Sequence, residues 1–187
     1  MMKSSFQGNR LALRPFEPHD VPALQAYLNH PDLSGRRFIP WAFPDIAPLS
    51  QRQVEGIVQR WAEADRSLPL AVIRPDAGQL IGHAECDWHW DPHQPSVQVV
   101  IAPDYQRQGH GSEVLELLMR HLLDYTPAHN VSCWIADWNK PALTFCQRHG
   151  FRVAGRMRRA GIHQGRYFDL VINDILRTEW KAAHAGE

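Results

Sequence analysis

The sequence predicts an α/β fold in which helices flank a mixed, mostly antiparallel sheet of about seven strands. Two observations lead to this prediction. Short runs rich in β-branched residues recur between turn residues, and other segments repeat apolar residues at helical spacing. In chain order, three strands that can pair antiparallel precede a strand–helix–strand–helix–strand series. Right-handed crossovers then make the middle strands of the sheet parallel.

The first half of the chain is expected to contain three strands and two helices. A strand over Arg10–Phe16 precedes a helix over Val21–Leu28, which Asp20 can cap. Ser50 followed by Gln53 forms a capping-box signal at the start of the second helix. The two further strands are expected over Leu68–Ile73 and Gln79–Trp90.

Between these helices, the segment from His30 to Pro48 is rich in proline and aromatic residues. We expect an irregular lobe there. A well-packed loop and a mobile wall over a substrate cleft are both open interpretations, because loops with aromatic residues often carry specificity.

The strand expected over Gln79–Trp90 has one polar face. Strict alternation puts Ile81, His83, Glu85, Asp87 and His89 on that face, opposite Leu80, Gly82, Ala84, Cys86, Trp88 and Trp90. Histidines beside Glu85 and Asp87, His93 included, can bind zinc, but no H-E-x-x-H or comparable spacing is present. We therefore expect surface or hydrogen-bonding histidines and no metal.

A turn with two glycines links the fourth strand, at Val97–Ile101, to the helix that follows. Pro103 ends the strand, and Q-R-Q-G-H-G then occupies positions 106–111. Free N–H groups at a helix start, next to glycines that lack side chains, suit an anion, and Arg107 can add charge. An ordinary strand-to-helix turn is the alternative. Neither the dinucleotide motif nor the P-loop motif is present.

The last third of the chain alternates strands and a helix. A fifth strand is expected over Val131–Asp137 and a short helix over Asn139–His149, with Gly150 as its C-terminal cap. Two last strands, Phe151–Met157 and Tyr167–Leu176, are expected to be joined by a polar connecting segment.

Composition narrows the class of protein. The 187 residues are 44% hydrophobic and carry 20 basic against 20 acidic side chains, which leaves no electrostatic footprint for nucleic acid or an anionic membrane. Three widely spaced cysteines without a disulfide pattern indicate a reducing cytoplasm. Neither a signal peptide nor a membrane-spanning run is visible. We expect one domain over residues 1–187, as a monomer or homodimer.

Three features of the chain resemble the GNAT superfamily of acetyl-CoA-dependent N-acetyltransferases. Q-x-x-G-x-G over residues 106–111 matches the family's pyrophosphate loop. N-x-x-A from Asn139, with G-F at residues 150–151, looks like the family's helix after the fifth strand. The tail over residues 161–180 is similar to the Rim-type branch, which acetylates the N-termini of ribosomal proteins.

The resemblance implies a cofactor site. In such folds the strands that hold Val99–Ile101 and Ile135–Asp137 splay apart, and the pantetheine arm of acetyl-CoA pairs with the first strand, whose N–H groups can also stabilise an oxyanion. Asn139 should lie beside this arm, with helix capping as its other role. The residues expected to bind the cofactor are Val99, Val100, Ile101, Gln106, Arg107, Gln108, Gly109, His110, Gly111, Ser112 and Asn139.

The resemblance is weakest at the catalytic residues. Many relatives have a tyrosine acid where this chain has Cys146, which is a candidate general acid or a packing residue. The family's glutamate base is missing, and Glu85, with Asp87 behind it, is the best replacement. An exposed sheet face is the alternative for both. Asp137 is a third candidate, or a helix cap.

We expect an N-acetyltransferase that moves an acetyl group to a primary amine by direct attack, without an acyl-enzyme. At pH 7 an α-amine with a pKa of ~8 is about a tenth neutral, whereas a lysine amine is neutral to a few parts in ten thousand. A weak base therefore favours a peptide N-terminus or a small amine of low pKa. The rivals are a non-catalytic acyl-CoA-binding module and a detoxifying enzyme whose closed pocket is lined by Trp41, Trp88 or Trp138.

Overall fold

The computed structural model describes residues 6–33, 36, 48–88 and 91–185. The expected lobe at His30–Pro48 thus falls largely outside the described residues. The chain divides into two compact units, Met1–Asp87 with Gln98–His121, and Trp88–Val97 with Leu122–Glu187. The single-domain expectation stays a prediction.

The strands form a seven-stranded sheet in the order β1-β2-β3-β4-β5-β7-β6. Among the described residues, the parallel pair is β4 with β5, and the pairings β1–β2, β2–β3, β5–β7 and β6–β7 are antiparallel. The mixed, mostly antiparallel sheet that the sequence predicts is therefore confirmed.

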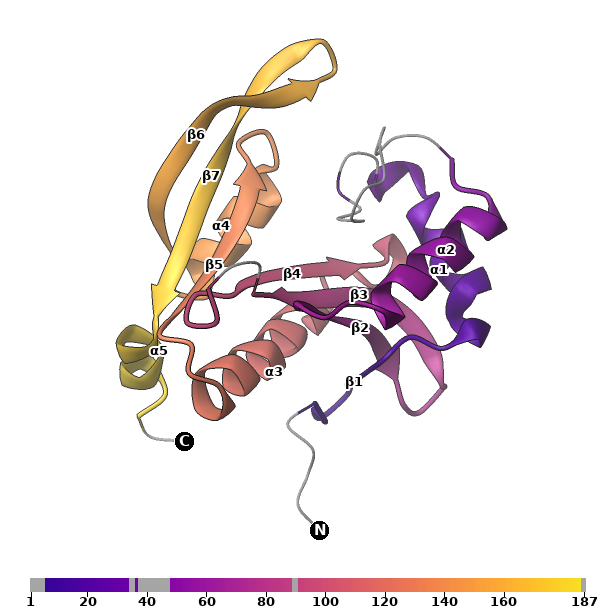
Figure 1. Ribbon diagram of the computed structural model, residues 1–187, viewed down its shortest axis with the longest axis horizontal. Helices are drawn as coiled ribbons and strands as arrows, with labels where there is room; N and C mark the ends of the chain where they lie inside the picture. Colours follow the sequence, from indigo (N-terminus) through magenta and orange to yellow (C-terminus); the bar gives the residue numbers. More distant parts are fainter. Residues whose placement is uncertain (1–5, 34–35, 37–47, 89–90, 186–187) are drawn as a thin grey trace. The chain divides into compact units, whose positions relative to one another are not determined.

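The first unit contains the N-terminal strands, two helices and most of a third. Figure 1 shows α1 and α2 on one side of its strands and α3 on the other. Its elements are β1 (Ala12–Arg14), α1 (Val21–Leu28), α2 (Gln51–Ala62), β2 (Ser67–Arg74), β3 (Gln79–Asp87), most of β4 (Ser96–Ile101) and most of α3 (His110–Tyr125), with 3-10 turns at Pro18–Asp20, Pro31–Leu33 and Pro103–Tyr105.

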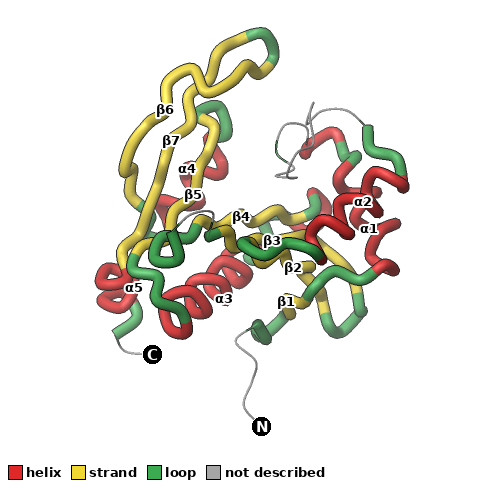
Figure 2. Tube along the Cα trace, in the orientation of Figure 1, coloured by secondary structure: helices red, strands yellow, loops and turns green. Residues whose placement is uncertain are grey.

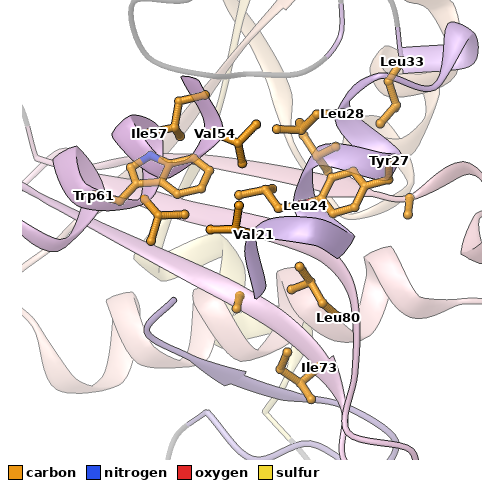
Figure 3. Close-up of a cluster of buried hydrophobic side chains, with 14 residues drawn as sticks. Val21, Leu24, Tyr27, Leu28, Leu33, Val54, Ile57, Trp61, Ile73 and Leu80 are labelled. Atoms are coloured by element: carbon orange, nitrogen blue, oxygen red, sulfur yellow. The ribbon is translucent and has the colours of Figure 1, made fainter. Parts of the chain in front are cut away.

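Apolar residues of α1 and α2 pack with strand residues to make one core cluster (Figure 3). Its members include Val21, Leu24, Leu28, Val54, Ile57, Trp61, Ile73 and Leu80. Each such side chain stabilises the fold by about 1.5–3 kcal/mol when fully buried. Each of the two helices thus buries one face in this cluster.

The two helix starts in this unit differ in how they are held. At α2 the capping box is confirmed, because the Gln53 amide donates to Ser50 Oγ at 3.3 Å and the Ser50 amide donates to Gln53 Oε1 at 2.8 Å. At α1 the expected cap is wrong, since the Asp20 side chain makes no cap hydrogen bond. Its carboxylate instead accepts both Arg14 Nη atoms, at 2.7 and 2.8 Å.

A β-bulge in β3 changes which residues share a face. In the pairing of β2 with β3, Val72 faces Gly82 and Ile73 faces Leu80, so Ile81 is the extra residue. Leu80 therefore lies on the face of His83 and Glu85, in the cluster with α1 and α2. The strict alternation expected for this strand is wrong at Leu80, because the bulge resets the period of two.

The second unit contains the start of β4 and the C-terminal elements. These are β5 (Asn130–Ala136), α4 (Lys140–Arg148), β6 (Arg152–His163), β7 (Arg166–Leu176) and α5 (Arg177–Ala183), a helix that the sequence did not reveal. Gly150, at a φ of +85°, ends α4 as predicted.

The segment expected to be a polar connection between the last two strands is mostly strand. Strands β6 and β7 form one long hairpin (Figure 2), with its turn at Gln164 and Gly165. Their φ angles of 51° and 75° are those of a two-residue type I′ turn, which fits the twist of an antiparallel pair. The expected polar connection is therefore wrong.

The buried ion pair of Asp20 gives the first prediction. Burial alone would raise the pKa of Asp20, but hydrogen bonds from Arg14 and from the Glu17 amide outweigh it and lower the pKa below 3.8. Asp20→Asn should cost about 3 kcal/mol of unfolding free energy near pH 7, because it leaves Arg14 without its partner. Urea unfolding against pH measures this.

The pH dependence has a defined sign. A carboxyl whose pKa is lowered on folding contributes stability above its unfolded pKa, and that contribution is lost as the pH falls through the folded value. The gap between parent and variant should therefore close in acid. Asp76→Asn, in the surface pair with Arg74, is the control and should change stability by only about 0.5 kcal/mol. A pH-independent gap at Asp20 would contradict the prediction.

Candidate cofactor and catalytic site

The glycine loop begins where β4 ends, and one side chain fastens it there. Gln106 donates from Nε2 to the Ile101 carbonyl at 2.8 Å, and its main-chain amide donates to the Pro103 carbonyl at 3.2 Å. Gln108 makes a similar contact, from Nε2 to the Asp104 carbonyl at 2.9 Å. The two glutamine side chains therefore hold the loop in shape.

The main-chain amides that follow Gln106 point to no protein acceptor. From Arg107 to Ser112, none has a hydrogen-bond partner in the part of the chain that the structure describes, and the amide of Glu113 is the first to enter the helix, bonding to the Gly109 carbonyl at 3.2 Å. Arg107 and Gly109 have φ angles of 58° and 84°. Left-handed residues among free amides make an anion-binding concavity.

A contact distant in sequence braces this loop. Glu113, in the first turn of α3, accepts the amides of Arg10 and Leu11 on Oε1 at 2.7 and 3.2 Å, and Arg10 Nε on Oε2 at 2.9 Å. Arg10 Nη1 then donates to the Gln108 carbonyl at 3.0 Å. The hydrogen bonds from Arg10 and Leu11 outweigh burial and lower the pKa of Glu113, so its carboxylate stays charged.

The Arg10 guanidinium also lies against Gly109. A Cβ at Gly109 would come within 3.1 Å of Arg10 Nη2, an atom with no hydrogen-bond acceptor among the described residues. Positive charge and a spare donor therefore stand beside the free amides.

His110 fills the space below the loop. Its side chain is buried, and Nδ1 has no hydrogen-bond partner in the described parts of the chain. Burial, with a contribution from nearby Arg10, lowers the pKa of His110. The ring is therefore neutral at pH 7, and the positive charge at the loop comes from arginine.

Strand β4 departs from a regular strand at the residues expected to hold the cofactor arm. Val97 is buried, but Gln98 and Val99 are both half-buried, so the in–out alternation breaks as it does at a bulge. On the β3 side, a Cβ at Gly82 would overlap the Val100 carbonyl oxygen. Glycine at position 82 therefore permits the close approach of β4 at Val100.

The polar face of β3 lies against helices rather than solvent. Glu85 is only 6% exposed and Asp87 is half-buried, so the exposed-face alternative is wrong for Glu85. His83, on the same face, has Nδ1 at 2.9 Å from the Tyr27 hydroxyl. Burial raises the pKa of Tyr27 well above its ordinary value, so the hydroxyl keeps its proton.

In the second unit, the residues after β5 are held by the main chain. Asn139 is buried at the start of α4, but its side chain makes no cap hydrogen bond, so the capping role is wrong and its carbonyl bonds the helix amides instead. The Asp137 carboxylate lies 3.5 Å from Arg156 Nη1. Asp137 is not the helix cap, because α4 begins at Lys140 and Asn139 occupies the cap position.

Cys146 does not stand alone in the core of this unit. Its Sγ lies 3.3 Å from Sγ of Cys133 on β5, and both thiols are buried and free. The hydrogen bond between them, with burial, raises the pKa of Cys133, and the same bond lowers the pKa of Cys146. Either sulfur can be the donor in this contact.

The remaining sequence expectations concern a metal site, membrane-spanning helices and the tryptophans of a closed pocket. No cluster of three metal-ligating side chains occurs among the described residues, and none of the helices in those residues is long and apolar enough to cross a membrane. His89, Trp90 and Trp41 lie outside the described residues. Trp138 stacks on His163 with ring centroids 4.0 Å apart.

Comparison with known proteins decides the family. Residues 10–152 match the family model described as an acetyltransferase (GNAT) domain. The chain belongs to the GNAT acetyltransferase family. YnaD of Bacillus subtilis strain 168, an uncharacterised N-acetyltransferase, is 23% identical over 171 residues, 91% of this chain and 96% of that protein.

Solved structures show the same fold. A GNAT-family acetyltransferase from Bacillus anthracis has a TM-score of 0.79 at 20% identity, covering 92% of this chain and 98% of that one. A spermidine N-acetyltransferase from Vibrio cholerae, in complex with CoA and spermine, has a TM-score of 0.76 at 19% identity and covers 91% and 98%. This GNAT protein is an acyl-CoA-dependent N-acetyltransferase, with acetyl-CoA as co-substrate.

Sequence reasoning missed three residues, Arg10, Glu113 and Cys133, which contact the predicted site residues or hold others that do. Arg10 and Glu113 lie 103 positions apart and Cys133 lies 13 before Cys146, so no local spacing pattern could pair them. The acidic residue in the first turn of the helix was the only available signal for Glu113.

Arg10→Met should weaken acetyl-CoA binding to this GNAT protein about tenfold, because it removes one charge-assisted donor and the brace on Gln108 while keeping the apolar stem. Isothermal titration calorimetry measures the dissociation constant. Arg120→Met, which breaks a surface pair with Glu116 on α3, is the matched control and should bind like the parent. Equal affinity of all three proteins would contradict the prediction.

Proposed function

We propose that this GNAT acetyltransferase transfers the acetyl group of acetyl-CoA to the α-amino group of a peptide or protein N-terminus, the acceptor that the resemblance of its tail to the Rim-type branch implies. The amine attacks the thioester carbonyl directly, and the tetrahedral intermediate collapses to the amide and CoA. The observation that carries the proposal is the braced row of free amides from Arg107 to Ser112.

The cofactor is proposed to bind along the first unit. The free amides from Arg107 to Ser112, with Arg10 beside them, suit the diphosphate. The pantetheine arm is proposed to pair with Val99–Ile101, and Asn139 stays a predicted cofactor-binding residue of the second unit. Within the described ranges, β4 pairs with β5 only at Ser96 and Ser132. This short pairing supports the proposal, because it does not use the main chain of Val99–Ile101.

The proton transfers are assigned to two groups. Glu85, with Asp87 as the alternative, takes the proton of the attacking amine, directly or through water. Cys146 gives its proton to the departing CoA thiolate. The contact with Cys133 lowers the pKa of Cys146, which supports this role.

A second acceptor is a small polyamine. One solved relative is a spermidine N-acetyltransferase, and its likeness to this chain is a likeness of fold. The α-amine is preferred because its pKa of ~8 leaves far more neutral amine at pH 7 than an alkylamine near ~10.4. A buried carboxylate acting as the base then needs to deprotonate a smaller share of the bound amine.

A panel of amines tests the assignment. Release of CoA thiol is followed with a peptide that has a free N-terminus, the same peptide blocked at its N-terminus but carrying a lysine, and spermidine. We expect the free N-terminus to react at least about tenfold faster at pH 7. Faster turnover of spermidine would instead support the polyamine candidate, and no turnover of any amine would contradict transfer.

The cofactor assignment needs its own variant with a matched control. Gly109→Glu puts a negative charge and a Cβ at the loop, where φ is +84° and Arg10 is near, and should abolish acetyl-CoA binding in calorimetry. Gly78→Glu adds the same charge at a similar φ of +61°, with open space around it, and should bind normally. Binding that survives Gly109→Glu would remove the loop from the site.

Glu85→Gln should lower kcat about a hundredfold and remove the acidic limb of the pH–rate profile, because a positioned general base contributes about that much. The measurement is kcat as a function of pH at saturating acetyl-CoA. Asp87→Asn, two residues along the same face, is the control. An acidic limb that follows Asp87→Asn and ignores Glu85→Gln would move the role to Asp87.

A further inference from the structure

The two thiols of the second unit form a site of their own. Cys133 lies in the middle of β5 and Cys146 in the second turn of α4, and their sulfur atoms are 3.3 Å apart. A disulfide bond is about 2.05 Å long, so the two sulfur atoms must approach each other by roughly 1.2 Å. Each residue is 7% exposed, so both thiols are buried.

The pair is also chemically asymmetric. The thiolate is the nucleophile in oxidation, and Cys146 is the sulfur whose pKa the partner lowers, while Cys133 keeps its proton. Cys86 differs from both. It is fully buried on β3, its pKa is raised by burial, and it belongs to the other unit.

We infer that Cys133 and Cys146 form a reversible disulfide when the protein meets a hydroperoxide. The Cys146 sulfur attacks the O–O bond, which gives a sulfenic acid and releases the alcohol, or water when the oxidant is hydrogen peroxide. Cys133 then attacks the sulfenic sulfur, and its proton leaves with the hydroxyl group as water. Two thiols and one hydroperoxide thus yield a disulfide, an alcohol and a water molecule.

The disulfide closes the segment that connects β5 to α4 and takes the S–H proton from Cys146. If Cys146 is the general acid, a step that rests on the proposed function, oxidation stops acetyl transfer and a thiol reductant restores it. The formation of the disulfide itself does not depend on that role.

The experiment treats the full-length protein with hydrogen peroxide, stops the reaction, and measures intact mass, peptide linkage and acetyl transfer before and after dithiothreitol. We expect a mass lower by two thiol hydrogens, a linked Cys133–Cys146 peptide, and a rate that falls about a hundredfold and recovers with reductant. A linked pair with an unchanged rate would keep the disulfide and overturn the acid role of Cys146.

Cysteine variants keep the inference falsifiable. Cys133→Ala should stop at a Cys146 sulfenic acid, which dimedone traps, and Cys86→Ala should form the disulfide like the parent. Thermal unfolding of each variant shows that it is folded. Oxidised parent protein with no Cys133–Cys146 linkage, or equal dimedone labelling of parent and Cys133→Ala, would overturn the inference.

Discussion

The carboxylate of Glu113 ties the N-terminal strand region to the start of α3, and the loop between β4 and α3 depends on that tie. Three donors from Arg10 and Leu11 converge on its two oxygens, and Arg10 passes the constraint on to the carbonyl of Gln108. With its carbonyl held this way, the loop turns its amides outward. A rigid, unsatisfied row of donors binds an anion without first breaking internal bonds.

A second constraint acts on the neighbouring strand. Because Gly82 has no side chain, the Val100 carbonyl can press against β3, and the bulge at Ile81 falls beside it. Regular pairing would give β4 an even alternation, and β4 does not have one. The contacts that shape the loop and the strand come from three separate segments of the sequence.

Sequence reasoning succeeded where the signal was local. The bounds of α1, the capping box at Ser50 and the cap at Gly150 all depend on neighbouring residues, and the glycine loop is a contiguous motif. It failed where the outcome depended on a distant partner. Asp20 could cap a helix, but its carboxylate accepts hydrogen bonds from Arg14 instead. The alternation of β3 is reset by its pairing with β2. Cys146 was found by its place in a motif, but only the fold reveals Cys133.

One residue of the loop bears a cost. Arg107 has a φ of 58°, a left-handed conformation that costs an ordinary L-residue roughly 1–2 kcal/mol and that glycine adopts freely. Selection for heat resistance alone would favour glycine at this position, whereas the proposed binding of a diphosphate favours the arginine. Directed evolution toward thermostability would therefore favour Arg107→Gly, and under the proposed function that change would weaken the binding of acetyl-CoA.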